Sequence, residues 1–185
     1  MARKPTIYTV GHSTHSLAEL VAILEAHGIR QLVDIRSIRR SRANPQFEAA
    51  ALARGLRRHG IAYTAIDALG GRRSKAKPPP RLPDDAWEHP SFRNYADYAQ
   101  TPAFRAGLDE LLALAKRAPT AIMCAEAVWW RCHRRIVADH LLARGVPVVH
   151  VLSATKAEPA TPTPFAVFTR GRVHYPRTPP ASRAR

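Results

Sequence analysis

Short apolar runs alternate with amphipathic stretches along most of this chain. Five runs have the length and composition of buried strands, and they are Thr6–Val10, Gln31–Ile35, Ile61–Ile66, Thr120–Cys124 and Val146–Leu152. Four stretches carry apolar residues at helical spacing, and they are Ser16–His27, Phe47–His59, Pro102–Arg117 and Arg134–Ala143. Ser16 and Glu19 have the spacing of a capping box, which fixes the start of the first helix.

This alternation predicts an α/β fold with a mostly parallel five-stranded sheet flanked by helices. Near the end, Phe165–Phe168 and Arg172–Tyr175 flank a glycine-containing turn and predict a small C-terminal hairpin. We expect a single domain over residues 1–176 and a disordered basic tail over 177–185. A Pro- and Arg-rich insertion at about 70–90 is too polar for core, and is either a solvated linker or a binding loop.

The chain has no apolar run of the roughly 18 residues that cross a membrane. No signal-peptide hydrophobic region precedes the first strand either. We therefore expect a cytoplasmic protein with no membrane partner. In a reducing compartment its two cysteines, Cys124 and Cys132, should be thiols.

The net charge of +15 changes this picture of an ordinary α/β domain. Arginine supplies 24 of the 29 basic residues, which a coding bias would explain. A coding bias does not explain the excess of positive over negative charge. That excess favours a polyanionic partner, so a nucleic acid or a nucleotide is expected.

Aromatic residues around the insertion allow two interpretations. Trp87, Phe92, Tyr95 and Tyr98 lie close together in the sequence, interleaved with arginines. Rings beside arginines suit unpaired nucleobases. The alternative is a small satellite core that holds the insertion down.

Polar residues and glycines follow the carboxyl ends of the expected strands, where parallel sheets bind ligands. Gly11 and Ser13 follow the first strand and suit an anion, because a sharp turn exposes backbone amides beside a hydroxyl. Both common nucleotide-binding glycine fingerprints are absent. Arg36 and Arg39 follow the second strand and, with Arg134, are expected to clamp phosphate. Asp34 is either a charged partner of an arginine or a working carboxylate.

The junction between the fourth strand and the last helix, Cys124–Arg135, carries the densest chemistry. A cysteine nucleophile of the phosphatase type needs an arginine six residues on, but Trp130 and Ala138 stand there. The spacing Cys-x7-Cys-His is no standard zinc motif, so no metal is assigned and the cofactor stays unknown. The third reading makes Glu126 a general acid or base and leaves Cys124 as a small apolar filler.

Four ordered motifs give the chain a resemblance to a known family. They are Thr9-Val-Gly-His-Ser13, Val33-Asp-Ile-Arg36, Cys124-Ala-Glu126 and Cys132-His-Arg134. They resemble the DUF488 family, a broad bacterial and archaeal family defined by sequence, over about Thr6 to Leu152. The resemblance implies a single α/β domain and marks the residues to test, but it brings no reaction. Those residues are His12, Ser13, Asp34, Arg36, Glu126, Cys132, His133 and Arg134.

The sequence thus predicts an intracellular enzyme that binds a phosphate-bearing substrate at the C-terminal edge of the sheet. Glu126, His133, Cys132, Asp34 and His12 are the candidate catalytic residues, and Gly11, Ser13, Arg36, Arg39 and Arg134 the candidate substrate-binding residues. Two alternatives stay open: a non-catalytic nucleic-acid-binding module, and a redox or metal protein that uses cysteine and histidine. The oligomeric state is not determined at this level.

Overall fold

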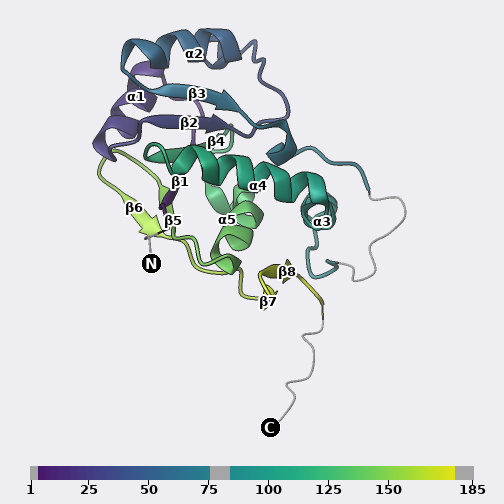
Figure 1. The fold of residues 1–185 in the computed structure, drawn as a ribbon. Coiled ribbons are helices and arrows are strands. Elements are labelled where there is room, and N and C mark those ends of the chain that lie inside the picture. The colour runs from purple at the N-terminus through teal and green to yellow at the C-terminus, as the bar shows by residue number, and fades with distance from the viewer. Residues whose placement is uncertain (1–3, 76–83, 178–185) are drawn as a thin grey trace.

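The computed structural model describes residues 4–75 and 84–177 and shows a six-stranded sheet with helices on both faces, beside a small hairpin (Figure 1). The strands are β1 (Ile7–Gly11), β2 (Gln31–Asp34), β3 (Ala62–Ala65), β4 (Thr120–Cys124), β5 (Val148–Val151), β6 (Ala157–Pro159), β7 (Val167–Thr169) and β8 (Arg172–His174). The helices are α1 (Leu17–Ala26), α2 (Ala49–Arg58), α3 (Pro90–Ala99), α4 (Pro102–Ala115) and α5 (Arg134–Ala143). Short 3-10 helices cover Pro45–Phe47, Asp67–Leu69 and Trp129–Arg131.

The sheet confirms the expected α/β fold and adds one strand to it. Its order is β3-β2-β4-β1-β5-β6, and the first five strands are parallel. The sixth, β6, runs antiparallel to β5 and was not expected, because three residues ending in proline carry no strand signal. The C-terminal hairpin of β7 and β8 is confirmed. Ser16 and Glu19 form the expected capping box at the start of α1.

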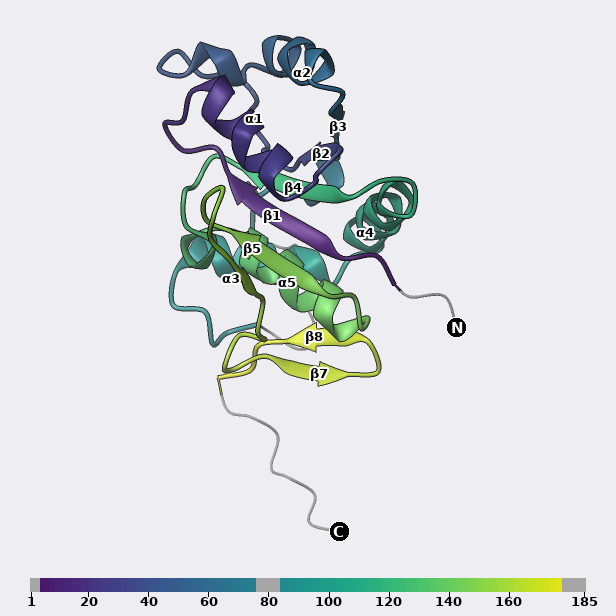
Figure 2. The ribbon, with the colours of Figure 1, turned by 90° about the vertical axis from the view of Figure 1, so that its left-hand side faces the viewer.

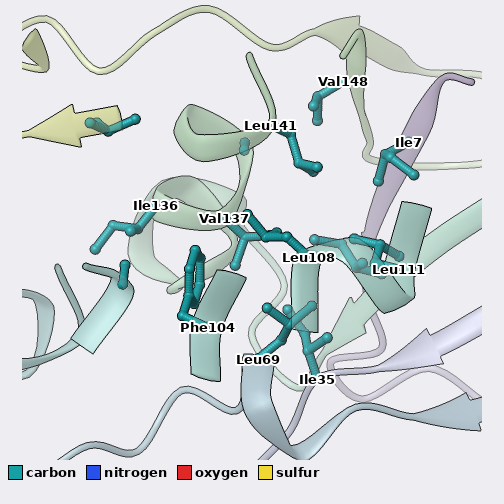
Figure 3. Packing of buried hydrophobic residues seen from close by; sticks show 14 of the residues in the cluster. Ile7, Ile35, Leu69, Phe104, Leu108, Leu111, Ile136, Val137, Leu141 and Val148 are labelled. Carbon is teal, nitrogen blue, oxygen red and sulfur yellow. The ribbon is translucent and has the colours of Figure 1, made fainter. Parts of the chain in front are cut away.

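Two separate cores fill the two faces of the sheet, as expected when helices cover both sides. Leu20, Leu24 and Leu52 of α1 and α2 pack on one face. On the other face lie α3, α4 and α5 (Figure 2), whose buried residues share one core, with Phe104 of α4 near Val137 of α5 (Figure 3). Among the described residues, no helix has both the length and the apolar character needed to cross a membrane.

The expected insertion is only partly solvated. Its described end carries the buried residues Asp84 and Trp87, and it leads into α3, a helix that was not expected. Trp87 contacts the rings of Phe92, Phe165 and Tyr175, so this end of the insertion is fastened to the hairpin. The middle of the insertion, 76–83, and the expected disordered tail from 178 onward lie outside the described residues.

Candidate functional site

A cavity of about 720 Å³ opens where β1, β2 and β4 end. These three strands are neighbours in the sheet, so the residues that follow them are brought together from distant parts of the sequence. Of the ten candidate residues, six line the cavity: His12, Ser13, Arg36, Glu126, Cys132 and His133. The other four, Gly11, Asp34, Arg39 and Arg134, support its walls or lie beside it.

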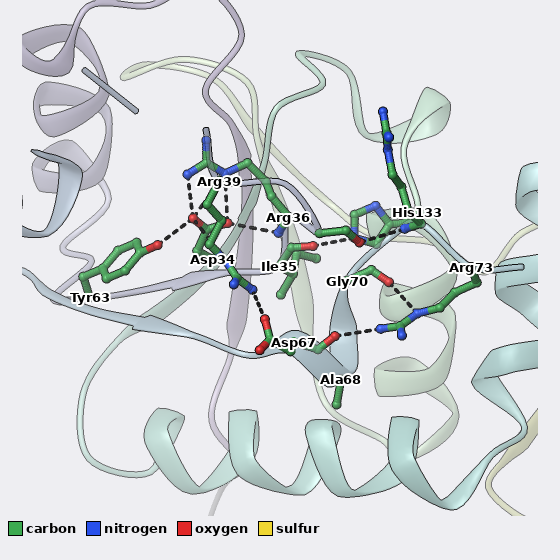
Figure 4. Close-up of polar contacts among 12 residues, drawn as sticks. Asp34, Ile35, Arg36, Arg39, Tyr63, Asp67, Ala68, Gly70, Arg73 and His133 are labelled. Carbon is green, nitrogen blue, oxygen red and sulfur yellow. Dashed lines mark hydrogen bonds and ion pairs between the residues drawn. The ribbon is translucent and has the colours of Figure 1, made fainter. Parts of the chain in front are cut away.

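Asp34 lies beneath the cavity and is fully occupied as a charged partner (Figure 4). Its carboxylate accepts hydrogen bonds from Arg36 Nε at 2.9 Å, Arg36 Nη2 at 2.6 Å and the Tyr63 hydroxyl at 2.7 Å. Burial and this bond raise the pKa of Tyr63, which keeps its hydroxyl protonated as a donor. Because Asp34 does not reach the cavity, its place favours the charged-partner interpretation over a catalytic one.

Arg36 is held rigidly but keeps part of its hydrogen-bonding capacity for a ligand. Besides Asp34, it donates to the Phe47 carbonyl at 2.8 Å and to His12 Nε2 at 3.2 Å. A guanidinium has five N–H donors, so one remains without a partner among the described residues. Since Arg36 is 5% exposed and lines the cavity, this donor is available there at little entropic cost.

His12 acts as a support for Arg36. Its Nε2 accepts from Arg36, so Nδ1 carries the proton and donates to the Ser13 carbonyl at 2.9 Å. The ring stacks on Phe47 with the centroids 4.0 Å apart. Burial lowers the pKa of His12, which keeps the imidazole neutral. With both nitrogens engaged, His12 is poorly placed to exchange protons with a substrate.

Gly11 is required by packing, and it offers no anion-binding amide. A side chain there would overlap the Glu126 carbonyl and lie 2.8 Å from the Ala127 carbonyl oxygen. The next two amides donate to the carbonyls of Cys124 and Ala125, so they are not free to bind an anion either. Ser13 does line the cavity, and its φ of 46° is an unusual conformation of the kind found at functional sites.

Arg134 fastens the loop between β4 and α5 and is not exposed to a ligand. It is 1% exposed, and its Nη2 donates to the carbonyl oxygens of Glu126 at 2.6 Å and Ala127 at 3.3 Å. The expected phosphate clamp at this position is therefore not what the structure shows. The reason is local: Arg134 opens α5, and its side chain turns under the preceding loop, whose carbonyls take up its donors.

Cys124, Cys132 and His133 form a compact cluster on the cavity wall. His133 Nδ1 lies 3.6 Å from Cys132 Sγ and 3.8 Å from Cys124 Sγ. The other ring nitrogen, Nε2, donates to the Ile35 carbonyl at 3.1 Å (Figure 4). Cys124 was expected to be a core filler. It is indeed buried, yet its sulfur belongs to this cluster, and the residue lines the cavity.

The two thiols of the cluster differ in acidity. Burial opposes ionisation of Cys132, but hydrogen bonds with Cys124 and His133 and the charge of Arg134 outweigh it and lower the pKa of Cys132 well below its usual value. The hydrogen bond with Cys132, together with burial, raises the pKa of Cys124. Arg134 Nε also donates to Cys132 Sγ at 3.4 Å.

Positive charge surrounds the mouth of the cavity, partly from arginines outside the ten candidate residues. Arg40, Arg72 and Arg131 are exposed and line it together with Arg36. Arg39, expected to bind phosphate, instead pairs with Asp67 at 2.6 Å and does not line the cavity (Figure 4). In sequence, Arg72 and Arg131 look like many other arginines of this chain. They belong to the site because the segments that carry them fold against the same cavity.

Most of the aromatic group around the insertion is core. Trp87 is 5% and Tyr95 1% exposed, and Tyr95 and Tyr98 donate to the backbone carbonyls of Leu69 and Ala68. Only Phe92 lines the cavity, so only its ring is available to stack on a ligand there.

Comparisons with known proteins give a family and no activity. A family model described as a domain of unknown function, DUF488, matches residues 16–141, which include the second, third and fourth motifs. No curated protein and no solved structure is significantly similar to the chain. Since the family model matches more than half of the 185 residues, the chain belongs to the DUF488 family.

Proposed function

We propose that this protein is an enzyme that binds a phosphate-bearing substrate, a nucleotide or the end of a nucleic acid, in the cavity at the carboxyl ends of β1, β2 and β4. The observation that carries the proposal is the set of four cavity arginines, Arg36, Arg40, Arg72 and Arg131. Guanidinium groups bind phosphate oxygens bidentately. A volume of about 720 Å³ suits a ligand of nucleotide size.

Two neighbours of these arginines support a nucleotide over inorganic phosphate. Phe92 places a partly exposed ring on the cavity wall, where a base can stack. Ser13 and Ser37 add hydroxyl groups on the opposite loops. The net charge of +15 attracts polyanions from a distance.

Glu126 is the residue that we assign to proton transfer. It is exposed on the cavity wall, and within the described ranges its carboxylate makes no hydrogen bond or ion pair. A carboxylate with no structural partner, in a cavity rich in arginine, is suited to act as a general acid or base. The other two reactive side chains that line the cavity are His133 and Cys132.

Binding of AMP, ATP and short single-stranded DNA and RNA tests the proposal, followed by product analysis. Replacing Arg72 by Gln should weaken binding of the preferred probe by roughly 10- to 150-fold, since a charged hydrogen bond contributes about 1.5–3 kcal/mol. Arg58→Gln removes the same charge from an exposed site at the end of α2 and should change little. Glu126→Gln should abolish turnover and leave binding intact. Equal effects of the two arginine variants would contradict the proposal.

The net charge of +15 favours a second candidate, a non-catalytic nucleic-acid-binding module. On that reading, binding falls steeply with salt, Glu126→Gln has no effect on it, and no product forms. Turnover that depends on Glu126 would exclude this candidate.

A further inference from the structure

We propose that Cys124, Cys132 and His133 bind a zinc ion, with the fourth coordination position open to the arginine-lined cavity. This site goes beyond the proposed function and does not depend on it, because the three ligands would hold the ion whatever the cavity binds. The ligand atoms lie within 4.8 Å of one another.

The two nitrogen-to-sulfur distances in the cluster match tetrahedral coordination. Zinc with Zn–S bonds of about 2.3 Å and a Zn–N bond of about 2.0–2.1 Å holds a sulfur and a nitrogen ligand about 3.6 Å apart. His133 Nδ1 lies 3.6 Å from Cys132 Sγ and 3.8 Å from Cys124 Sγ. Both sulfurs therefore already lie at the distance from Nδ1 that a shared zinc ion would set.

His133 is oriented as a metal ligand. Because Nε2 donates its proton to the Ile35 carbonyl, Nδ1 is the ring nitrogen that faces both sulfurs, and a bound metal would take its lone pair in place of a proton. Tyr95 packs edge-on against the ring at 4.9 Å, and the backbone at Gly71 covers its other side so closely that a Cβ there would overlap it. Such fixing of the ring by a backbone carbonyl and by packing is typical of metal-ligating histidines.

A neighbouring arginine favours the thiolate form of one ligand. Arg134 Nε donates to Cys132 Sγ at 3.4 Å, which supports a bound thiolate. Binding of a dication would release the protons that the ligand thiols still carry. Two thiolates and one imidazole are a ligand set that suits zinc.

All three ligands line the cavity, so the site resembles catalytic zinc sites, which keep one position open. Zinc in such a position lowers the pKa of a bound water. The unusual spacing of the ligands has a simple cause. Cys124 ends β4, Cys132 and His133 precede α5, and the loop between them folds back over Gly11.

Titration of reduced, metal-free full-length protein with Co²⁺ tests the site directly. We expect one cobalt per chain, with thiolate-to-metal charge-transfer absorption, and displacement of cobalt by Zn²⁺. Cys124→Ser, Cys132→Ser and His133→Gln should each weaken binding by more than about 100-fold, beyond the effect of changing an outer partner. His59→Gln, which removes an exposed histidine, should bind cobalt like the wild type.

Gly71→Ala provides a test that does not require a ligand variant to fold. It keeps every ligand but displaces the His133 ring, so cobalt binding should weaken by at least about 10-fold. The absence of charge-transfer absorption in the reduced wild type would overturn the proposal, as would unchanged binding by the cysteine variants. Neither result bears on nucleotide binding, which is measured separately, so failure of the metal site and failure of the proposed function are distinguishable.

Discussion

At the scale of single residues, Gly11 follows a strand as the glycine of an anion-binding turn would, but close packing against the next loop is what requires it. Gly11→Ala forces a methyl group into the carbonyl of Glu126, and we expect a loss of about 1–3 kcal/mol in the free energy of unfolding. Gly28→Ala is the control, because Gly28 has a φ of +66° but open space around it and tests backbone strain alone. Denaturant unfolding measures both. A smaller effect at Gly11 than at Gly28 would contradict the packing argument.

Asp34 is likewise a residue whose role depends on its partners. Asp34→Asn leaves Arg36 buried without its counter-ion, so we expect a loss of about 3–5 kcal/mol in unfolding free energy. Tyr63→Phe removes one of the same hydrogen bonds and should cost only about 1 kcal/mol. If Asp34→Asn instead preserved stability and abolished turnover, Asp34 would be catalytic and our interpretation would be wrong.

At the scale of elements, the loop between β4 and α5 depends on one side chain of α5. Arg134→Met removes the donors to the carbonyls of Glu126 and Ala127. We expect amide hydrogen exchange in residues 125–133 to accelerate by at least about 10-fold, the equivalent of roughly 1.4 kcal/mol. Exchange in α1, on the other face of the sheet, should not change.

The next residue of the helix supplies the matched control. Arg135 donates to Thr163 Oγ1 at 2.9 Å and lies over the ring of Trp87. Arg135→Met should therefore loosen the segment around Thr163 and leave 125–133 unaffected. The same exchange pattern in both variants would show that α5 as a whole, and not Arg134, holds the loop.

At the scale of the whole molecule, buried histidines link stability to pH. Burial, with smaller effects from Arg144 and His174, lowers the pKa of His140 from 6.5 to about 3. Below pH 6.5 the unfolded chain binds a proton at His140 that the folded protein does not, so the stability contributed by the neutral ring is lost as pH falls from 6.5 toward 3. At pH 5 the loss is about 2 kcal/mol.

His140→Leu should abolish this dependence, because leucine suits the packing against Phe104 and does not titrate. The quantity to measure is the difference in unfolding free energy between variant and wild type, which should grow in favour of the variant by about 2 kcal/mol from pH 7 to pH 5. Wild type and variant are compared because Asp84 gives both proteins a second pH dependence, which cancels in the difference. Burial raises the pKa of Asp84 to about 6, so the stability from its protonated form is lost as pH rises through 4 to 6, in the direction opposite to His140. His59→Gln controls for the loss of an exposed imidazole. A difference independent of pH would refute the assignment.

The regular elements of this fold were readable because their apolar periodicity is local. The five parallel strands, four helices, the capping box at Ser16 and the hairpin all follow from residues within a few positions of one another. The helix α3 was missed although Phe92, Tyr95, Ala96 and Ala99 have helical spacing, because proline and charge around it indicated a loop. No local signal exists for β6, which forms by pairing with β5.

The sequence by itself determined the α/β fold, the family motifs and the edge of the sheet where polar residues gather, since chain order and periodicity suffice for these. Only the tertiary structure decided which of those residues face a ligand. Strand order places β4 between β1 and β2, and this gathers the residues after all three strands around one cavity and puts His133 on the Ile35 carbonyl. The path of the loop between β4 and α5 then decides that Cys124 meets His133 and that Arg134 turns under the loop. Distances between side chains on different strands depend on that order, and no spacing along the chain encodes it.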